Sequence, residues 1–222
     1  MMRGCFVTGT DTGVGKTLVS AALLHALASH YPRVVGMKPV AAGSMRHGDG
    51  WANEDALALR AASTVVVPPA LDNPVLLPDA LSPHLAARRA GVAIDIAHIV
   101  SCYQQLSRLA DAVVVEGAGG FLVPLSDDTT GADLAQALAL PVLLVVGLRL
   151  GCLNHALLTL EAIRARGLTL VGWVANRIDL AMPAQDDNIA FLRRRLGVPL
   201  LADIPYSQAP DPRAITLTLP HP

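Results

Sequence analysis

The stretch GTDTGVGKT, residues 9–17, follows the apolar run CFV at residues 5–7 and precedes the apolar segment LVSAALL at residues 18–24. A buried strand, a glycine-rich turn and a helix start, in this order, are typical of a phosphate-binding P-loop. Gly13 and Gly15 let successive backbone N–H groups face one concavity, and the helix adds the positive end of its dipole. The stretch therefore predicts a nucleotide-binding α/β protein.

Two side chains of this stretch have expected roles at a bound nucleotide. Lys16 can reach the outer phosphates, and the Thr17 hydroxyl can ligate Mg²⁺. The spacing departs from the usual pattern by one residue, because Thr10 stands where the first glycine is expected and Gly9 lies one step earlier. The alternative interpretation is an ordinary strand-to-helix turn with an exposed lysine.

The composition favours one α/β domain over residues 1–222, with a mostly parallel sheet and helices on both faces. Hydrophobic residues make up 52% of the chain and aromatic residues only 4%, as expected for a buried parallel sheet under Ala/Leu-rich helices. No apolar run reaches the ~20 residues of a membrane span, so we expect no membrane association. A net charge of −1 provides no basic surface for nucleic acid.

The start of the chain and its cysteines favour a cytoplasmic protein. The N-terminus runs directly into the first expected strand, which leaves no room for a signal peptide. Cys5, Cys102 and Cys152 are odd in number and scattered, which favours reduced buried thiols over a disulfide framework or a metal site.

Lysine is rare in this chain. Of the 17 Lys and Arg residues only Lys16 and Lys38 are lysine, which leaves fifteen arginines. Lys38 ends the expected strand at residues 34–37, and ligands collect beyond the carboxyl ends of strands in open α/β sheets. Because a compact ammonium is not replaceable by a planar guanidinium at a phosphate approached end-on, Lys38 is a candidate for the same site as Lys16. The alternative is one stray surface lysine.

Two carboxylates are candidate metal ligands. Glu116 ends the apolar strand DAVVVE and is followed by Gly117, Ala118 and Gly119, the arrangement of a Walker B element whose carboxylate holds Mg²⁺. Acidic residues are also common at strand ends. Asp55 opens the expected helix at residues 56–62, where it could serve as a helix cap or as a metal ligand, and we favour the metal ligand.

Several further elements are expected from the apolar pattern. Residues 41–53 have neither helical nor strand periodicity and predict a loop over the site. Residues 64–67 predict a short strand, and Ser82 with Pro83 predicts a capped helix start. Asn176 ends another strand, where its amide could contact an adenine edge or belong to an ordinary turn.

The chain closely resembles the dethiobiotin synthetase family from Met1 to about Tyr206. The resemblance rests on GTDTGVGKT together with six further motifs, which are KPVAAG (38–43), NEDALAL (53–59), NPVLL with SPHLAA (73–87), VVVEGAGGFLVPL (113–125), LPVLLVVGLRLGCLNHALLT (140–159) and GWVANR (172–177). The family belongs to a P-loop group whose loop is shifted as in this chain.

The resemblance implies a reaction and its partners. The substrates would be 7,8-diaminononanoate, CO₂ or bicarbonate, and ATP with Mg²⁺, and the products would be dethiobiotin, ADP and phosphate. One amine takes up CO₂ as a carbamate, the carbamate attacks the γ-phosphate, and the second amine opens the resulting mixed anhydride. The family resemblance also implies a homodimer.

The resemblance assigns site residues by position. It implies catalytic roles for Lys38, Lys16 and Thr12, and a Mg²⁺ set of Thr17, Asp55 and Glu116. The nucleotide would contact Gly13, Val14, Gly15, Lys16, Thr17, Gly117, Ala118, Gly119, Asn176, Arg177, Pro205 and Tyr206. The substrate would contact Ala42, Ser44, Gly151, Cys152, Leu153 and Asn154. Many members carry serine or threonine where this chain has Ala42, so Ser44 is the candidate substitute.

Two rival functions share parts of this pattern. A nucleotide-switched partitioning or scaffold ATPase has the same shifted P-loop, but it carries a signature lysine near the start of the loop, where this chain has Asp11. A cobyrinate-type amide synthetase would need a glutaminase domain, for which the chain leaves no room. Dependence of phosphate release on a diamine and bicarbonate separates these alternatives.

Overall fold

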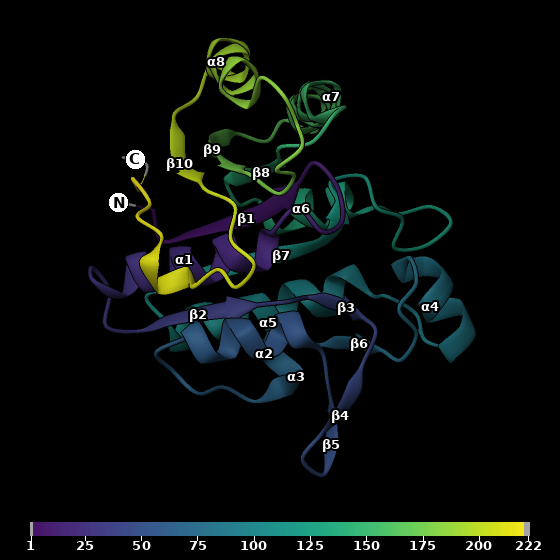
Figure 1. Cartoon of the computed structure of the whole chain (residues 1–222). Coiled ribbons are helices and arrows are strands. Elements are labelled where there is room, and N and C mark those ends of the chain that lie inside the picture. The colour runs from purple at the N-terminus through teal and green to yellow at the C-terminus, as the bar shows by residue number, and fades with distance from the viewer. Residues whose placement is uncertain (1, 220–222) are drawn as a thin grey trace.

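The computed structural model describes residues 2–219 and is built around one parallel sheet (Figure 1). Its strands follow the order β10-β9-β8-β1-β7-β2, and all neighbouring pairs are parallel. Their bounds are β1 Gly4–Gly9, β2 Val34–Met37, β7 Ala112–Gly120, β8 Val142–Gly147, β9 Leu170–Asn176 and β10 Leu200–Ile204. The predicted fold class is confirmed.

Helices cover both faces of this sheet. One face carries α1 Lys16–Ala28 and α2 Glu54–Ala62, and the 3₁₀ turn η1 Pro212–Ala214 lies over α1 (Figure 1). The opposite face carries α5 Ile96–Leu109, α6 Gly131–Leu138, α7 Cys152–Ala165 and α8 Gln185–Leu196. α4 Pro83–Ala90 lies to one side and packs against the strands at residues 40–42 and 75–77. Both faces of the sheet are therefore removed from water.

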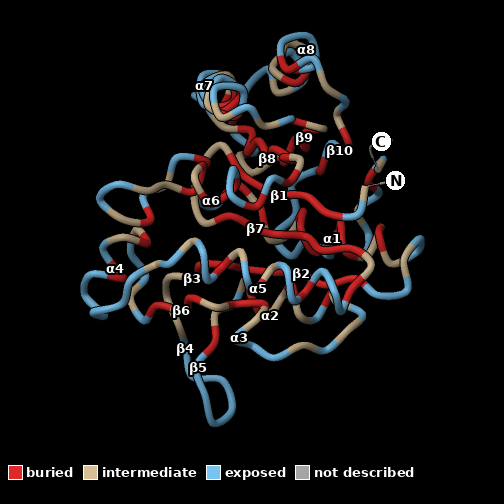
Figure 2. The backbone as a smooth tube through the Cα atoms, turned by 180° about the vertical axis from the view of Figure 1, so that it is seen from behind, coloured by how far each residue is buried: buried red, intermediate tan, exposed pale blue. Residues whose placement is uncertain are grey.

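The strands are apolar along their whole length because each face meets its own core. In β7, Val113 and Val115 belong to the core under α5 and α6, whereas Ala112 and Val114 belong to the core under α1. Side chains alternate across a strand, so a strand covered on both faces needs apolar residues at every position. Figure 2 shows the resulting band of buried backbone through the middle of the molecule.

Strand register brings the predicted site residues to one edge of the sheet. Val7 in β1 lies opposite Glu116 in β7, and Met37 in β2 lies opposite Val115. Because these strands are parallel, their carboxyl ends point the same way, toward the loops that bind ligands in such sheets. The P-loop after β1, Lys38 after β2 and Glu116 in β7 are thus neighbours by topology.

The prediction of a structureless loop at residues 41–53 is wrong. The segment from residue 40 contains β3 Val40–Ala42, β4 Met45–His47 and β5 Gly50–Ala52. β3 pairs with β6 Val75–Leu77, and β4 and β5 form an antiparallel hairpin that projects from the molecule (Figures 1 and 2). The hairpin is exposed except at Ala52, so it has no buried face and hence no apolar alternation to read.

One smaller prediction fails, and the predicted helix start at Ser82 and Pro83 is confirmed except for the side-chain cap. Residues 64–67 form no strand, because they lie beyond the edge strand β2 and Val66 is fully exposed, although Thr64 N donates to Val34 O at 2.9 Å. Ser82 begins α4 without capping it, because its hydroxyl pairs with His84 Nδ1 at 3.0 Å instead. The short helix α3 Pro69–Asp72 lies between these segments.

Two observations bear on the environment of the chain. Among residues 2–219, no helix combines the length and apolarity needed to cross a bilayer. Cys5, Cys102 and Cys152 are buried and unpaired, as predicted, and burial raises the pKa of the Cys5 thiol to about 12.

Candidate active site

The P-loop joins β1 to α1 with two glycines in the left-handed region. Gly13 has φ of 73° and Gly15 has φ of 92°, conformations that other L-residues rarely adopt. At Gly15 a Cβ atom would also lie only 2.2 Å from Asn176 Nδ2. Val14 between them is buried and packs against Gly147, where a Cβ would lie 2.8 Å from Val14 Cγ1. The loop is therefore held against the ends of β8 and β9.

Lys16 lies at the start of α1 and is buried. Its Nζ donates to the backbone carbonyl of Asp11 at 3.0 Å, so the side chain folds back over the loop. Burial and the nearby Lys38 lower the pKa of Lys16 to about 8, even though Glu116 and Asp55 raise it. At neutral pH the side chain still carries its charge, directed at the P-loop.

Thr17 joins the two predicted metal-binding carboxylates. Its hydroxyl lies 2.8 Å from Asp55 Oδ1 and 2.9 Å from Glu116 Oε1. Asp55 comes from the first turn of α2, which Asn53 caps by accepting from the backbone N–H of Asp55 at 3.0 Å. The structure thus brings together three residues separated by up to 99 positions in the sequence.

Lys38 lies between the same two carboxylates and is only 4% exposed. Its Nζ is 2.6 Å from Glu116 Oε1 and 2.8 Å from Asp55 Oδ2, and it donates to Gly117 O at 3.4 Å. Burial lowers the pKa of Lys38, but Glu116 and Asp55 outweigh burial and raise it, so Lys38 stays protonated. Burial raises the pKa of Asp55, and Lys38 outweighs this and lowers it.

The three oxygen-bearing residues fit a magnesium ion. Mg²⁺ prefers hard oxygen ligands and is usually held by one or two carboxylates together with phosphate oxygens. Glu116 is fully buried, and its Oε2 has no hydrogen-bond partner among the described residues. An unpaired buried carboxylate oxygen is costly unless a ligand satisfies it. Thr17, Asp55 and Glu116 are therefore the residues that would hold the ion.

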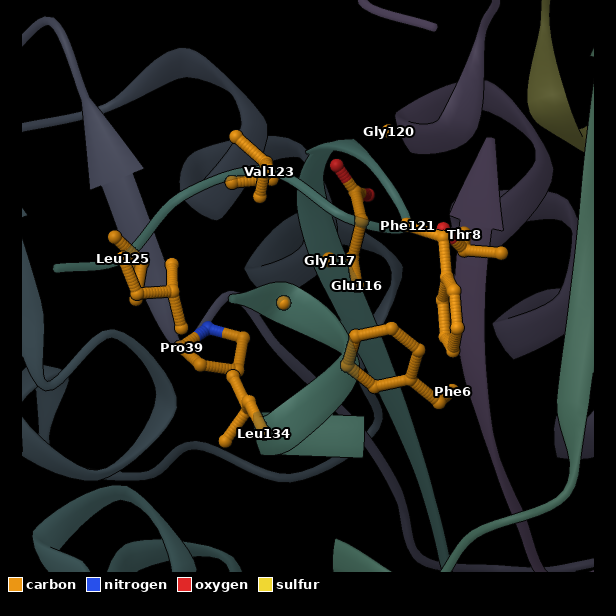
Figure 3. Close-up of a pocket in the computed structure, with 13 residues that line it drawn as sticks. Phe6, Thr8, Pro39, Glu116, Gly117, Gly120, Phe121, Val123, Leu125 and Leu134 are labelled. Carbon is orange, nitrogen blue, oxygen red and sulfur yellow. The ribbon is translucent and has the colours of Figure 1, made fainter. Parts of the chain in front are cut away.

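An apolar wall supports Glu116 from behind. A cavity of about 10 Å³, no more than one water molecule, lies among Phe6, Pro39 and Leu134, and the Glu116 carboxyl group points away from Phe6 and Leu134 (Figure 3). At Gly117 a Cβ would lie 2.9 Å from Phe6 Cζ, so the residue after Glu116 must be glycine for the strand to pack on this wall.

A pocket of about 720 Å³ opens in front of Lys38. It is lined by Asp11, Thr12, Lys38, Val40, Ala42, Asn53, Asp55, Ala80, Leu81, Ser82, Pro83, Ala118, Gly119, Gly120 and Val123. Ala42 and Thr12 thus belong to the pocket, as does Gly119, whose Cβ would lie 3.4 Å from Thr12 Oγ1. Ser44 does not line it. Its backbone N–H donates to Pro78 O at 3.1 Å in the connection to β4.

Asn176 lies against the P-loop. Its Nδ2 donates to Val14 O at 2.9 Å, so one amide hydrogen supports the loop. Arg177 next to it is held by Asp203 at 2.8 and 2.9 Å and by Asp186 at 2.5 Å. Pro205 and Tyr206 follow β10 on the exposed surface. Pro205 lines a pocket of about 460 Å³ between β10 and the C-terminal segment.

The segment before α7 lies beside the P-loop. Gly151 precedes the helix with φ of 95°, Cys152 is buried, Leu153 is half-buried and Asn154 is exposed. Arg149 forms an ion pair with Asp11 of the P-loop, a contact that the sequence did not predict. The two residues are 138 positions apart, and arginine is common in this chain, so no local signal pointed to the pair.

Three further polar residues near Lys38 were missed. Asp72 and Asn73 are both buried and contact the backbone of Lys38, and Arg60 of α2 pairs with Asp72. Asn73 stands in the motif NPVLL, which indicated family membership but no role. A buried asparagine in a proline-rich connection has no signature pattern of its own.

The fold and the site together define a P-loop nucleotide-binding protein. A family model described as an AAA domain matches residues 3–213. The chain resembles a ParA family ATPase from Chlorobium tepidum TLS, with a TM-score of 0.57, 18% identity, and coverage of 94% of this chain and 86% of that one. It resembles the MinC:MinD cell division protein complex of Aquifex aeolicus equally, with a TM-score of 0.57, 18% identity, and coverage of 93% and 82%.

Curated relatives narrow this class. The chain is 58% identical to the ATP-dependent dethiobiotin synthetase BioD of Janthinobacterium sp. (strain Marseille), over 95% of this chain and 91% of that protein. It is 59% identical to the protein of the same name in Ralstonia nicotianae (strain ATCC BAA-1114 / GMI1000), over 94% and 91%. The chain belongs to the family of ATP-dependent dethiobiotin synthetases. The predicted family, enzyme class and use of ATP are confirmed, and the partitioning ATPases share only the fold.

Proposed function

We propose that this enzyme closes the cyclic urea of dethiobiotin from 7,8-diaminononanoate, CO₂ and ATP. The observation that carries the proposal is Lys38 Nζ, buried within 2.8 Å of Glu116 Oε1 and Asp55 Oδ2, beside the P-loop and facing a pocket of about 720 Å³. A lysine in this place is suited to an anion that must approach a triphosphate. A switch ATPase has no need of such a pocket.

The chemistry proceeds in three balanced steps. An amine nitrogen of the substrate attacks CO₂ and loses a proton, which forms a carbamate. A carbamate oxygen attacks the γ-phosphorus, the bond to the β-phosphate oxygen breaks, and ADP leaves. The second amine attacks the carbonyl carbon of the carbamic-phosphoric anhydride, phosphate departs with the bridging oxygen, and the nitrogen loses a proton as the ring closes.

The residues of the site reduce the repulsion between the carbamate and the triphosphate of ATP. The backbone N–H groups of residues 12–17 and the Lys16 ammonium bind the phosphates, while Lys38 steadies the carbamate. Thr12 lines the pocket on the P-loop side, where it would face the carbamate and the γ-phosphate. Fixed charges in a site that excludes most water act more strongly than the same charges in solution.

Magnesium would be held by Thr17, Asp55 and Glu116. When bound, the ion supplies positive charge that offsets the negative charge of the phosphates. Glu116 reaches this place from the buried strand β7, and Asp55 from the capped start of α2. Two rigid elements therefore fix the two carboxylates.

The substrate would lie along the pocket, with its amines near Lys38 and its hydrocarbon chain against Val40, Ala42 and Val123. Its carboxylate, at the far end of the chain, would bind the start of α7 in a second subunit of a homodimer, through the N–H groups of Gly151, Leu153 and Asn154. The N–H of Cys152 already donates to Arg149 O at 3.0 Å. Ser44 lies outside the lining residues, so we assign it no direct contact and leave Ala42 as the contact from this loop.

The adenine would lie near Asn176, between Pro205 and Tyr206. Asn176 has a carbonyl oxygen and a second amide hydrogen for the base edge in addition to its bond to Val14. Arg177 would act by holding Asp203 and the start of this segment in place. The use of ATP and reduced buried thiols favours the cytoplasm as the location.

The test is the requirement for all substrates. Purified protein is incubated with ATP, Mg²⁺, bicarbonate and a panel of diamino acids, and phosphate release is measured. We expect release only when bicarbonate and a vicinal diamine are both present, with the nine-carbon acid as the best substrate. ATP hydrolysis at an equal rate without the diamine would contradict the proposal.

A further inference from the structure

Lys38 leaves the sheet at a point where its backbone loses strand partners. β2 ends at Met37, it is the edge strand, and Pro39 follows with no backbone N–H to donate. The N–H of Lys38 donates instead to Asp72 O at 2.7 Å, and the carbonyl of Lys38 accepts from Asn73 Nδ2 at 2.7 Å. Two consecutive residues at the end of α3 therefore hold both polar groups of the Lys38 backbone.

The side chain of Asp72 is fixed in turn by Arg60. Arg60 Nε lies 2.6 Å from Asp72 Oδ2 and Arg60 Nη2 lies 2.6 Å from Asp72 Oδ1, which is bidentate geometry. The Asp72 side chain is only 2% exposed. Arg60 belongs to α2, the helix that carries Asp55. The pair thus ties α2 to the segment that holds Lys38.

These contacts form a closed ring of interactions that begins and ends at Lys38. Lys38 Nζ pairs with Asp55 on α2 at 2.8 Å, Arg60 on α2 pairs with Asp72, and Asp72 O accepts from Lys38 N. A buried ion pair is weak evidence for stability, because its desolvation cost offsets much of the attraction. Its constraint on geometry is the more direct consequence. A lysine has a flexible four-carbon stem, so the place of Nζ depends on a fixed backbone.

We propose that Asn73 and the Arg60–Asp72 pair are positioning residues that fix Lys38 relative to Asp55 and Glu116. The inference rests on the proposed function, because it assigns these residues to the step in which Lys38 acts. Among the described residues, their side chains form no hydrogen bond or ion pair with the P-loop. Their loss should therefore affect turnover and leave nucleotide binding nearly unchanged.

The experiment compares Asn73→Ser and Arg60→Lys with wild type. Active sites are titrated with ADP, so that only folded protein is counted, and kcat, KM for ATP and ADP affinity are measured. We expect kcat to fall by about 10-fold to 100-fold, as for small misplacements of a reacting group, with ADP affinity within about twofold. Arg60→Lys retains the charge and removes only the bidentate geometry, so it tests the proposal even if Asn73→Ser folds poorly.

A matched control lies at the opposite end of β2 and β7, the strands that precede Lys38 and contain Glu116. Arg33 before β2 pairs with Asp111 before β7 through Nε and Nη2, at 3.2 and 2.7 Å, so Arg33→Lys likewise removes bidentate geometry, at the end of β2 opposite to Lys38. We expect this variant to keep wild-type kcat. Equal losses of kcat in Arg33→Lys and Arg60→Lys would show general destabilisation and overturn the proposal.

A double variant completes the test. In a Lys38→Ala background, the change Arg60→Lys should reduce kcat no further, because the group that it positions is gone. The inference would be overturned if the losses of kcat from Lys38→Ala and Arg60→Lys were fully additive. It would also be overturned if kcat were unchanged in both Asn73→Ser and Arg60→Lys. Failure of the proposed function is distinguishable, because wild type itself would then lack phosphate release that depends on diamine and bicarbonate.

Discussion

Lys38 is the residue on which the proposed chemistry depends most. Its ammonium is buried between two carboxylates, and a planar guanidinium has a different shape and reach. We expect Lys38→Arg to lower kcat by about 100-fold or more, as for the loss of a fixed charge at a reacting anion. ADP affinity should stay within about threefold, because Lys38 is not in the P-loop. Steady-state kinetics and ADP titration measure both, and near-normal turnover would remove Lys38 from the mechanism.

Asp55 has two possible roles at the start of α2, metal ligand and helix-end carboxylate. Asn53 already caps the helix by accepting from two backbone N–H groups, so the carboxylate of Asp55 is not needed for that purpose. We expect Asp55→Asn to raise the Mg²⁺ concentration for half-maximal rate by at least about tenfold, because a charged oxygen ligand is lost. A matched variant is Glu54→Gln, one residue earlier, which should leave the Mg²⁺ titration unchanged. Identical titrations for both variants would assign Asp55 to the helix alone.

Sequence analysis could find the residues of this site that carry a motif or a rare residue type. Lys16 and Thr17 belong to a motif, and Lys38 was visible because lysine is nearly absent elsewhere. Asn73 gave no such signal, because its role lies in contacts to a residue 35 positions away. Arg149 was hidden among fifteen arginines. Partners of this kind are set by the packing of whole elements, which the local sequence does not encode.

At the level of elements, the core strands were predictable and the peripheral ones were not. Strands such as β7 and β8 are buried on both faces, so their apolar runs stand out in the sequence. The hairpin of β4 and β5 has no buried face and gave no pattern. Residues 64–67, with three valines, looked like a strand, but in the described structure only Thr64 bonds to β2 and no strand forms. Strands could therefore be recognised in the sequence where both of their faces are buried, and strand propensity alone did not identify them.

Asp133, at the start of helix α6, predicts how the stability of the fold depends on pH. Asp133 accepts from Thr130 N and Thr130 Oγ1, both at 2.7 Å, and pairs with Arg166, while Leu134 beside it contributes to the wall behind Glu116. Burial raises the pKa of Asp133, but these partners outweigh it and lower the pKa to about 2. Because the folded pKa is below the unfolded one, the stabilisation is present above about pH 4 and is lost as pH falls toward 2.

We therefore expect Asp133→Asn to lower the free energy of unfolding by about 1 kcal/mol at pH 7, which is typical of a lost helix cap. The difference between wild type and variant should shrink as pH is lowered from 5 to 3, because the unfolded wild-type chain takes up a proton at Asp133 in this range while the folded protein keeps the carboxylate ionised. Urea unfolding at several pH values measures this difference. A difference that stays constant down to pH 3 would contradict the assigned pKa.

At the level of the whole molecule, the proposed homodimer places each substrate between two subunits. A Lys16→Gln subunit lacks the phosphate contact but keeps the start of α7, whereas a Leu153→Pro subunit has the reverse defect. When equal amounts are mixed and allowed to exchange, half of the dimers are mixed and each contains one intact composite site. We expect recovery of about a quarter of wild-type activity from two inactive proteins. An active monomer, or no recovery despite subunit exchange, would rule out a shared site.

The central claim is that a carbamate oxygen attacks the γ-phosphate of ATP, and oxygen isotopes test it most directly. A single turnover is started with ¹⁸O-labelled CO₂, the diamine, ATP and Mg²⁺, faster than the label exchanges with water, and the phosphate is examined by mass spectrometry. The proposed sequence predicts that each phosphate carries one labelled oxygen, left behind when the second amine expels it from the anhydride. Phosphate that carries only oxygen from ATP and water would contradict it, and would mean that ATP is hydrolysed without passing through the mixed anhydride.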